Sequence, residues 1–122
     1  MIDFKRFVID GNEVVFINNS RNTRSGFAHD SEMHINGYRY SKNTCYYLNR
    51  TWERYRFQSV MQGCIDNAIE NCKRILKEEY KAKNGVKRMT EKHQKAFNDL
   101  LCNDKEYQLL RKIMAKVDEG GF

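Results

Sequence analysis

The stretch that decides the fold opens with Asn49-Arg-Thr-Trp-Glu-Arg-Tyr-Arg-Phe-Gln-Ser-Val-Met61 and continues to Tyr80. Apolar side chains recur in it at steps of three and four, at Trp52, Tyr55, Val60, Met61, Cys64, Ile65, Ala68, Ile69, Cys72, Ile75, Leu76 and Tyr80. This spacing places them on one stripe of an α-helix, which a strand cannot do. Asn49 or Thr51 is expected to cap the start, and Gly85 to end the helix in the left-handed conformation. Such an amphipathic helix needs a surface to lie on.

The residues before this helix predict that surface, because they have the pattern of antiparallel strands. Segments rich in Val, Ile, Phe and Tyr are predicted to be strands, namely residues 2–9, 13–18, 32–35 and 38–41. Asp10-Gly11-Asn12 and Asn36-Gly37 separate them in pairs and supply the positive-φ residues that tight hairpins require. Thr44–Leu48 is a possible further strand, while the polar segment Asn19–Asp30 is expected to be an exposed loop.

The residues after Gly85 are helical again. Thr90 is expected to cap a short helix, and Asn103 with Glu106 has the spacing of a capping box that opens a last helix. The predicted fold class is therefore α+β in a single domain, residues 1–122. Residues 1–48 form an antiparallel sheet of four or five strands packed on the long central helix. Residues 49–122 are the helical part, with two shorter helices after the long one.

Composition limits the class of protein. A chain of 122 residues with 31% charged and 40% hydrophobic residues is typical of one folded domain rather than of a disordered chain. It has no apolar run long enough to span a bilayer and no signal-peptide pattern at its N-terminus. We therefore expect a cytosolic protein without membrane contacts, in which the cysteines remain reduced.

The positive charge is concentrated in one segment. The net charge is +6, and the residues from Lys73 to Lys92 contribute +5 of it, from eight basic and three acidic side chains. Such a segment attracts nucleic acid or an acidic protein surface by long-range steering. The alternative is a solvated helix end whose lysines suit the negative pole of the helix dipole.

The sequence contains no motif of a known catalytic site. It has no Gly-rich phosphate loop, no nucleophile elbow and no paired-histidine metalloprotease motif, so we do not expect an enzyme. Zinc ligands spaced two to four residues apart are also absent. A structural zinc site built across elements remains open, with His29, Cys45 and Cys64 as ligands. The alternative is that the cysteines are small core residues, since free cysteine is often buried.

Tyrosines and arginines alternate around the start of the long helix. Arg39 and Tyr40 belong to this group, and such residues stack bases and grip phosphates or anchor a protein interface. The alternative is that about half of the rings fill the core while the arginines extend from its edge. We expect a mixture, with Trp52 inside and several tyrosines at the rim.

Two longer strings of residues are distinctive, Arg21-Asn-Thr-Arg-Ser-Gly-Phe-Ala-His-Asp30 and Cys45-Tyr-Tyr-Leu-Asn-Arg-Thr-Trp-Glu-Arg-Tyr-Arg-Phe-Gln-Ser-Val-Met61. They resemble a group of small proteins from phages and mobile elements of Gram-positive bacteria, over about a third of the chain. Some small phage proteins of this kind are anti-CRISPR proteins that inhibit the RNA-guided nuclease of type II systems. His29 and Cys45 lie inside the similar strings, which favours the zinc hypothesis.

The resemblance implies a function in evading host defence. The expected protein is a phage-encoded inhibitor in the cytoplasm of the infected bacterial host, which binds a type II CRISPR effector nuclease and blocks DNA loading or cleavage stoichiometrically. Its basic charge argues against DNA mimicry, which needs an acidic surface. Six residues are expected to contact the partner, namely Arg39, Tyr40, Lys73, Arg74, Lys77 and Lys81. The alternative is a small basic phage regulator that binds nucleic acid.

Overall fold

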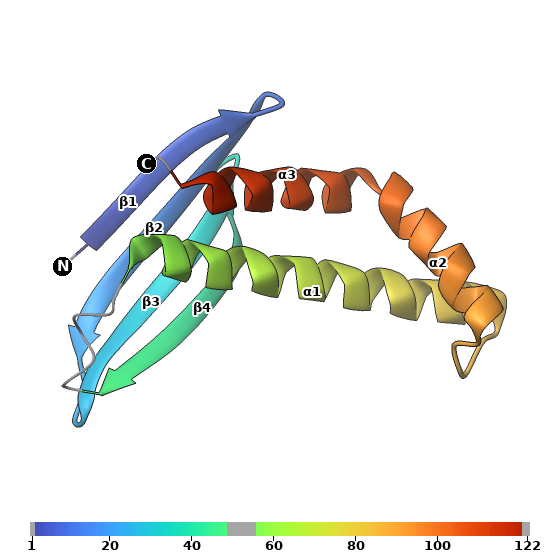
Figure 1. Ribbon diagram of the computed structural model, residues 1–122, viewed down its shortest axis with the longest axis horizontal. Helices are drawn as coiled ribbons and strands as arrows, with labels where there is room; N and C mark the ends of the chain where they lie inside the picture. Colours follow the sequence, from blue (N-terminus) through green and yellow to red (C-terminus); the bar gives the residue numbers. More distant parts are fainter. Residues whose placement is uncertain (1, 49–55, 121–122) are drawn as a thin grey trace.

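The computed structural model of the chain describes residues 2–48 and 56–120. Its elements follow one another as β1 (Ile2–Ile9), β2 (Asn12–Asn22), β3 (Gly26–Ile35), β4 (Tyr38–Leu48), α1 (Phe57–Asn84), α2 (Glu91–Asn103) and α3 (Lys105–Glu119) (Figure 1). The predicted α+β class is confirmed, with a sheet of four strands, a long helix and two shorter helices. None of the described helices is long and apolar enough to cross a membrane.

The sheet is an antiparallel meander in which each strand pairs with the next along the chain. Both predicted hairpin turns are confirmed. Asp10 and Gly11 have φ of 50° and 78°, and Asn36 and Gly37 have φ of 52° and 84°. Positive φ at both central residues gives the turn a twist that matches the twist of the flanking strands.

The predicted loop between residues 19 and 30 is wrong, because most of it is strand. β2 continues to Asn22 and β3 already begins at Gly26, with the hydrogen bond from Thr23 N to Gly26 O (2.9 Å) closing the turn. Polar cross-strand pairs sustain this part of the ladder: Arg21 forms an ion pair with Asp30 (2.6 Å). Pairing with a neighbouring strand thus outweighs the low strand propensity of polar residues. Thr44–Leu48 is likewise the end of β4 and not a fifth strand.

The predicted start of the long helix is also wrong. α1 begins at Phe57, and Arg56 stands at its N-cap position without a side-chain cap. Asn49, Thr51, Trp52 and Tyr55 all lie outside the described residues. The recurrence of apolar residues every three or four positions indicates residues that suit a helix. It does not indicate where the preceding strand ends. The predicted end is confirmed, because Gly85 follows α1 with φ of 62° and its N–H bonds to Lys81 O.

The caps of the two shorter helices lie close to the predicted positions. Thr90 caps α2, accepting a hydrogen bond from His93 N as expected. The N-cap of α3 is Asp104 rather than Asn103, and its carboxylate accepts from Tyr107 N at 2.8 Å. Asn103 instead ends α2, where its side chain donates to Asp99 O at 2.9 Å. A capping-box spacing therefore located this helix boundary to within one residue.

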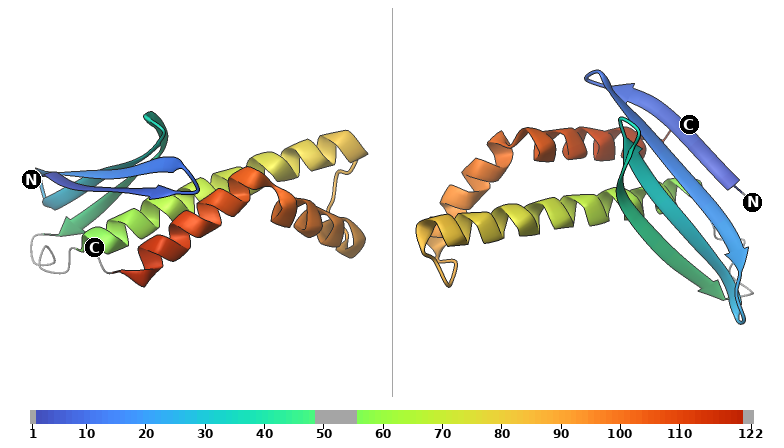
Figure 2. Two further views of the ribbon diagram at one scale, coloured as in Figure 1. Left: turned by 90° about the horizontal axis from the view of Figure 1, so that it is seen from above. Right: turned by 180° about the vertical axis from the view of Figure 1, so that it is seen from behind.

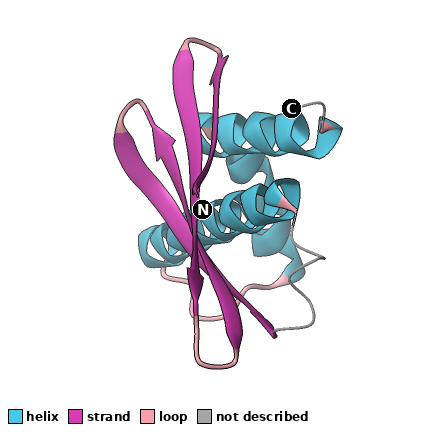
Figure 3. Cartoon of the chain, turned by 90° about the vertical axis from the view of Figure 1, so that its left-hand side faces the viewer, coloured by secondary structure: helices cyan, strands magenta, loops and turns pink. Residues whose placement is uncertain are grey.

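The helices cover one face of the sheet, and none of the described helices lies against the other face (Figure 3). The core lies between this face, α1 and α3, and its buried side chains include Val14, Phe16, Met33, Cys64, Ile65, Leu110, Ile113 and Val117. Gly63 allows the close approach of α1 to β4, because a Cβ there would lie 2.7 Å from Asn43 Nδ2. α1 and α3 run side by side beyond the edge of the sheet, and α2 crosses at their far end (Figure 2). The basic end of α1 thus lies away from the sheet.

Candidate functional site

The three residues predicted to bind zinc lie between the sheet and α1, but they engage different partners. His29 on β3 and Cys45 on β4 stand opposite each other in register. His29 is 4% exposed, and its Nδ1 lies 2.7 Å from Ser20 Oγ. The Cys64 thiol on α1 lies 3.4 Å from Ser31 Oγ. Within residues 2–48 and 56–120, the ligand atoms of His29, Cys45 and Cys64 do not come within 4.8 Å of one another as one group.

The pKa shifts of His29 and Cys64 are those of polar side chains buried between the sheet and α1. Burial lowers the pKa of His29, although Asp3 and Asp30 raise it. Burial also raises the pKa of the Cys64 thiol, which therefore stays protonated at neutral pH. A neutral imidazole and a protonated thiol are both suited to a dry interior, which agrees with the alternative that Cys64 is a core residue.

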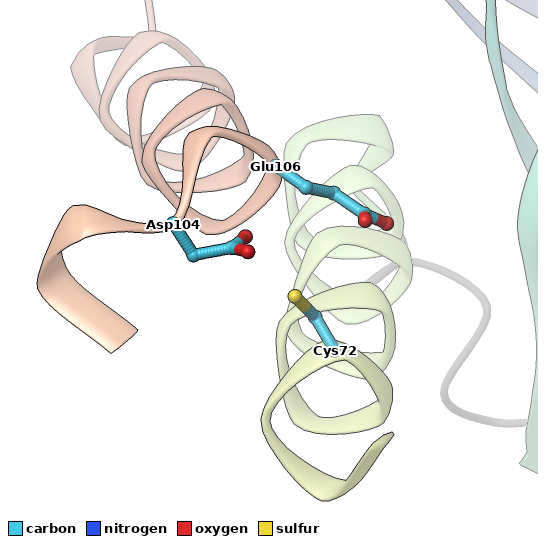
Figure 4. A group of neighbouring side chains, drawn as sticks. All are labelled: Cys72, Asp104 and Glu106. Atoms are coloured by element: carbon cyan, nitrogen blue, oxygen red, sulfur yellow. The ribbon is translucent and has the colours of Figure 1, made fainter. Parts of the chain in front are cut away.

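A different group of side chains gathers at the start of α3. Cys72, Asp104 and Glu106 each offer a ligand atom, and these atoms all lie within 4.8 Å of one another. Figure 4 shows the Cys72 thiol on α1 pointing toward the two carboxylates. Among the described residues it is the only such group of three, and we call it the metal-ligand group because it can in principle hold a metal ion.

The Cys72 thiol is the buried end of this group. Cys72 is 6% exposed, and its thiol makes no hydrogen bond with any residue that the structure describes. Burial raises the pKa of the thiol, and the charge of Asp104 raises it further. The thiol is therefore protonated unless a cation displaces the proton, because thiolate is the form that binds metal.

Both carboxylates are held by neighbouring donors. Asp104 caps α3 through the hydrogen bond from Tyr107 N, which occupies its Oδ1. Glu106 accepts a hydrogen bond through Oε1 from the hydroxyl of Tyr40 on β4. The second oxygen of each carboxylate accepts no hydrogen bond from the residues that the structure describes, so the two donors orient the carboxylates without using all of their acceptor capacity.

A basic groove lies next to this group, between α1 and the α2–α3 corner. Its volume is about 670 Å³. We define the basic groove by its lining side chains, Glu70, Lys73, Arg74, Lys77, Gln94, Phe97, Asn98, Leu101, Cys102 and Tyr107. Three of them are cations and one is an anion, and the Glu70 carboxylate lies 3.6 Å from Lys73 Nζ. The amide side chains and the cations together can hold carboxylates or phosphates.

The residues predicted to contact a partner lie in different parts of the structure. Lys73, Arg74 and Lys77 line the basic groove, as their helical spacing allows. Lys81 lies one turn further along α1 and is not among the lining residues. Arg39 forms an ion pair with Glu32 (3.4 Å) on the sheet. Tyr40, in contrast, reaches Glu106 and thus belongs to the surroundings of the metal-ligand group.

Sequence reasoning missed the two carboxylates of this group. Asp104 and Glu106 are separated by a single residue, but Cys72 lies more than 30 positions earlier in the chain. The sequence analysis used Glu106 only with Asn103, as the spacing of a capping box, and that spacing indicated a helix start rather than a metal site. The convergence depends on how α3 folds back along α1.

Comparison with protein-family models, with curated proteins and with solved structures finds no match to this chain.

Proposed function

We propose that this protein is a phage-encoded inhibitor that binds a type II CRISPR effector nuclease of the bacterial host and blocks DNA loading or cleavage stoichiometrically. The observation that supports a binding role is the basic groove between α1 and α2, which is lined by Lys73, Arg74 and Lys77. An acidic patch on a protein partner complements such a groove. The choice of nuclease rests on the resemblance of residues 21–61, and it implies action in the cytoplasm of the infected host.

The proposed mode of action is binding and not catalysis. The basic groove is lined by cations, amides and apolar side chains, which suit a docking surface. Its position at one end of the molecule leaves the open face of the sheet free for a second contact with a large partner (Figure 3). A stoichiometric inhibitor needs only such contacts, placed where they prevent DNA loading or a conformational step of the nuclease.

Zinc is the ion that we propose for the metal-ligand group, in a structural role. Zinc accepts thiolate and carboxylate ligands in one site, and the thiol here is buried while the carboxylates face outward. The ion would link α1 to the start of α3, so its binding energy would add to the folding energy. Zinc analysis of protein purified without chelators or a His tag tests this role, and a zinc-free protein that is not stabilised by added zinc would contradict it.

The second candidate function is nucleic-acid binding, and one observation favours it. Gln94 and Asn98 on α2 lie across the basic groove from Lys73, and amides and cations together also suit phosphate oxygens. The salt dependence of binding distinguishes the two functions. Binding to DNA weakens steeply as the salt concentration rises, whereas a packed protein interface is less sensitive.

A cleavage assay tests the proposed function. Several type II nucleases are titrated with the protein, and the same preparation is titrated onto bare DNA. We expect dose-dependent inhibition that saturates near one equivalent for at least one nuclease. Charge reversal of Lys73, Arg74 and Lys77 should weaken inhibition strongly. Truncation of the same side chains to alanine should be milder, because exposed ion pairs contribute only about 0–1 kcal/mol each.

A matched variant controls for the change in net charge. Charge reversal of Arg24, Lys42 and Arg111 alters the net charge equally, but these side chains do not line the basic groove. Equal loss of inhibition in both variants would argue against the groove. Full cleavage by every nuclease at a large excess of protein, together with tight salt-sensitive DNA binding, would leave the nucleic-acid function.

A further inference from the structure

The basic groove shares one side chain with a hollow that contains two residues of the metal-ligand group. A second hollow of about 280 Å³ lies beside the groove, lined by Tyr40, Ala68, Asn71, Cys72, Arg74, Ile75 and Glu106. Arg74 lines both this hollow and the basic groove. Cys72 also precedes Lys73 and Arg74 directly on α1, and Glu106 precedes the groove residue Tyr107 on α3. The two sites therefore have a common wall.

The charges on the two sides of this wall oppose each other. Asp104 and Glu106 place two negative charges close together, and neither takes part in an ion pair with any described residue. Arg74 is exposed and makes no ion pair in the same part of the chain. Its long side chain can therefore turn toward Glu106 or toward the groove. Arg74 and Glu106 line the same hollow, so Arg74 is the cation of the basic groove that these carboxylates can attract in competition with an anionic partner.

We infer that binding of a divalent cation to Cys72, Asp104 and Glu106 strengthens the binding of an acidic protein segment in the basic groove, with Arg74 as the link. The inference rests on the proposed function, because it assumes that the groove takes an acidic partner. It adds a regulatory role to the metal site, which would otherwise only join α1 to α3. By thermodynamic linkage, the acidic partner strengthens metal binding by the same factor.

The charge balance gives the direction of the effect. The two carboxylates of the group carry two negative charges, and a divalent cation brings two positive charges. The net charge of the group therefore rises by at least one unit, even when Cys72 binds as a thiolate. The bound cation also occupies the carboxylate oxygens that attract Arg74. One unit of charge beside a solvent-exposed groove corresponds to an affinity change of roughly threefold at physiological salt, and higher salt screens it.

The test measures the affinity of a fluorescently labelled oligo-aspartate peptide for the protein, with and without equimolar zinc. Zinc binding is measured separately by calorimetry on protein stripped with chelator. We expect zinc to bind the unaltered protein and to raise its peptide affinity about threefold. Cys72→Ser should bind zinc weakly and lose the response. Arg74→Gln should still bind zinc but show a smaller response, because only the direct effect of the added charge on the groove remains, and a merely structural ion would give no response in either protein.

Cys45→Ser is the matched control, because it removes a thiol in β4 away from both sites, and it should respond as the unaltered protein does. Cys72→Ser, which binds zinc weakly, corrects for zinc bound by the peptide itself. If zinc binds and peptide affinity stays unchanged, the coupling is refuted while the groove remains. If zinc does not bind, the metal site is refuted. If zinc binds and the peptide does not bind in either form, the groove of the proposed function is refuted, and the coupling with it.

Discussion

Replacement of Asp104 separates the two roles that the structure gives to this carboxylate. Asp104 caps α3, accepting a hydrogen bond from Tyr107 N at 2.8 Å, and it also belongs to the metal-ligand group. α3 supplies Leu110, Ile113 and Val117, which are all 0% exposed in the core, so fraying of this helix costs stability of the whole domain. Asp104→Ala removes both roles, whereas Asp104→Asn keeps a good cap and removes the negative charge.

The expected magnitude follows from the lost cap. In the presence of chelator, Asp104→Ala should lower the free energy of unfolding by about 1 kcal/mol, and Asp104→Asn by only a few tenths. For a domain of this size, 1 kcal/mol corresponds to a fall in Tm of roughly 3–6 °C. Glu106→Gln, which does not cap the helix, should leave the stability without metal nearly unchanged.

Thermal and urea unfolding followed by circular dichroism measure these differences. Zinc at about 100 times its Kd should stabilise the unaltered protein by about 2.7 kcal/mol, and Asp104→Asn should lose most of this gain. If Asp104→Ala is as stable as the unaltered protein in chelator, the capping argument is wrong. If Asp104→Asn keeps the full zinc gain, Asp104 is not a ligand.

Three further predictions concern the stability of the fold. Ile113→Ala should cost about 2–5 kcal/mol because this side chain is fully buried, whereas Ile75→Ala, at a site 49% exposed, should cost much less in urea unfolding. Burial lowers the pKa of His29, so the stability that its neutral form contributes is fully present above the ordinary pKa near 6.5. This stability should be lost as the pH falls through the lowered pKa, and His29→Gln should flatten that part of the pH profile of stability. Gly85→Ala should cost about 1 kcal/mol, because φ there is 62°, and an unchanged midpoint of thermal unfolding would contradict the strained cap.

The sequence by itself determined the elements that depend on neighbours along the chain. The positive-φ pairs Asp10-Gly11 and Asn36-Gly37 fix hairpins because few residues adopt that conformation. Thr90 and Gly85 mark helix ends because a cap is satisfied within a few residues. The periodic apolar residues from Val60 to Cys72 do form the buried stripe of α1. The basic segment could also be found from the sequence, because the net charge of a segment follows from its amino-acid composition.

Only the tertiary structure decided the features that depend on distant pairing. Strand β2 extends through a polar segment because it pairs there with β3. The strand propensities of the residues in β2 carry no information about this pairing. The sequence analysis considered His29, Cys45 and Cys64 as zinc ligands, but the group of three that forms among the described residues is Cys72, Asp104 and Glu106. The outcome depended on side-chain direction and on the path of α3 back along α1. A metal-ligand group built from residues far apart in the chain leaves no local spacing to detect, because its geometry arises when the helices pack.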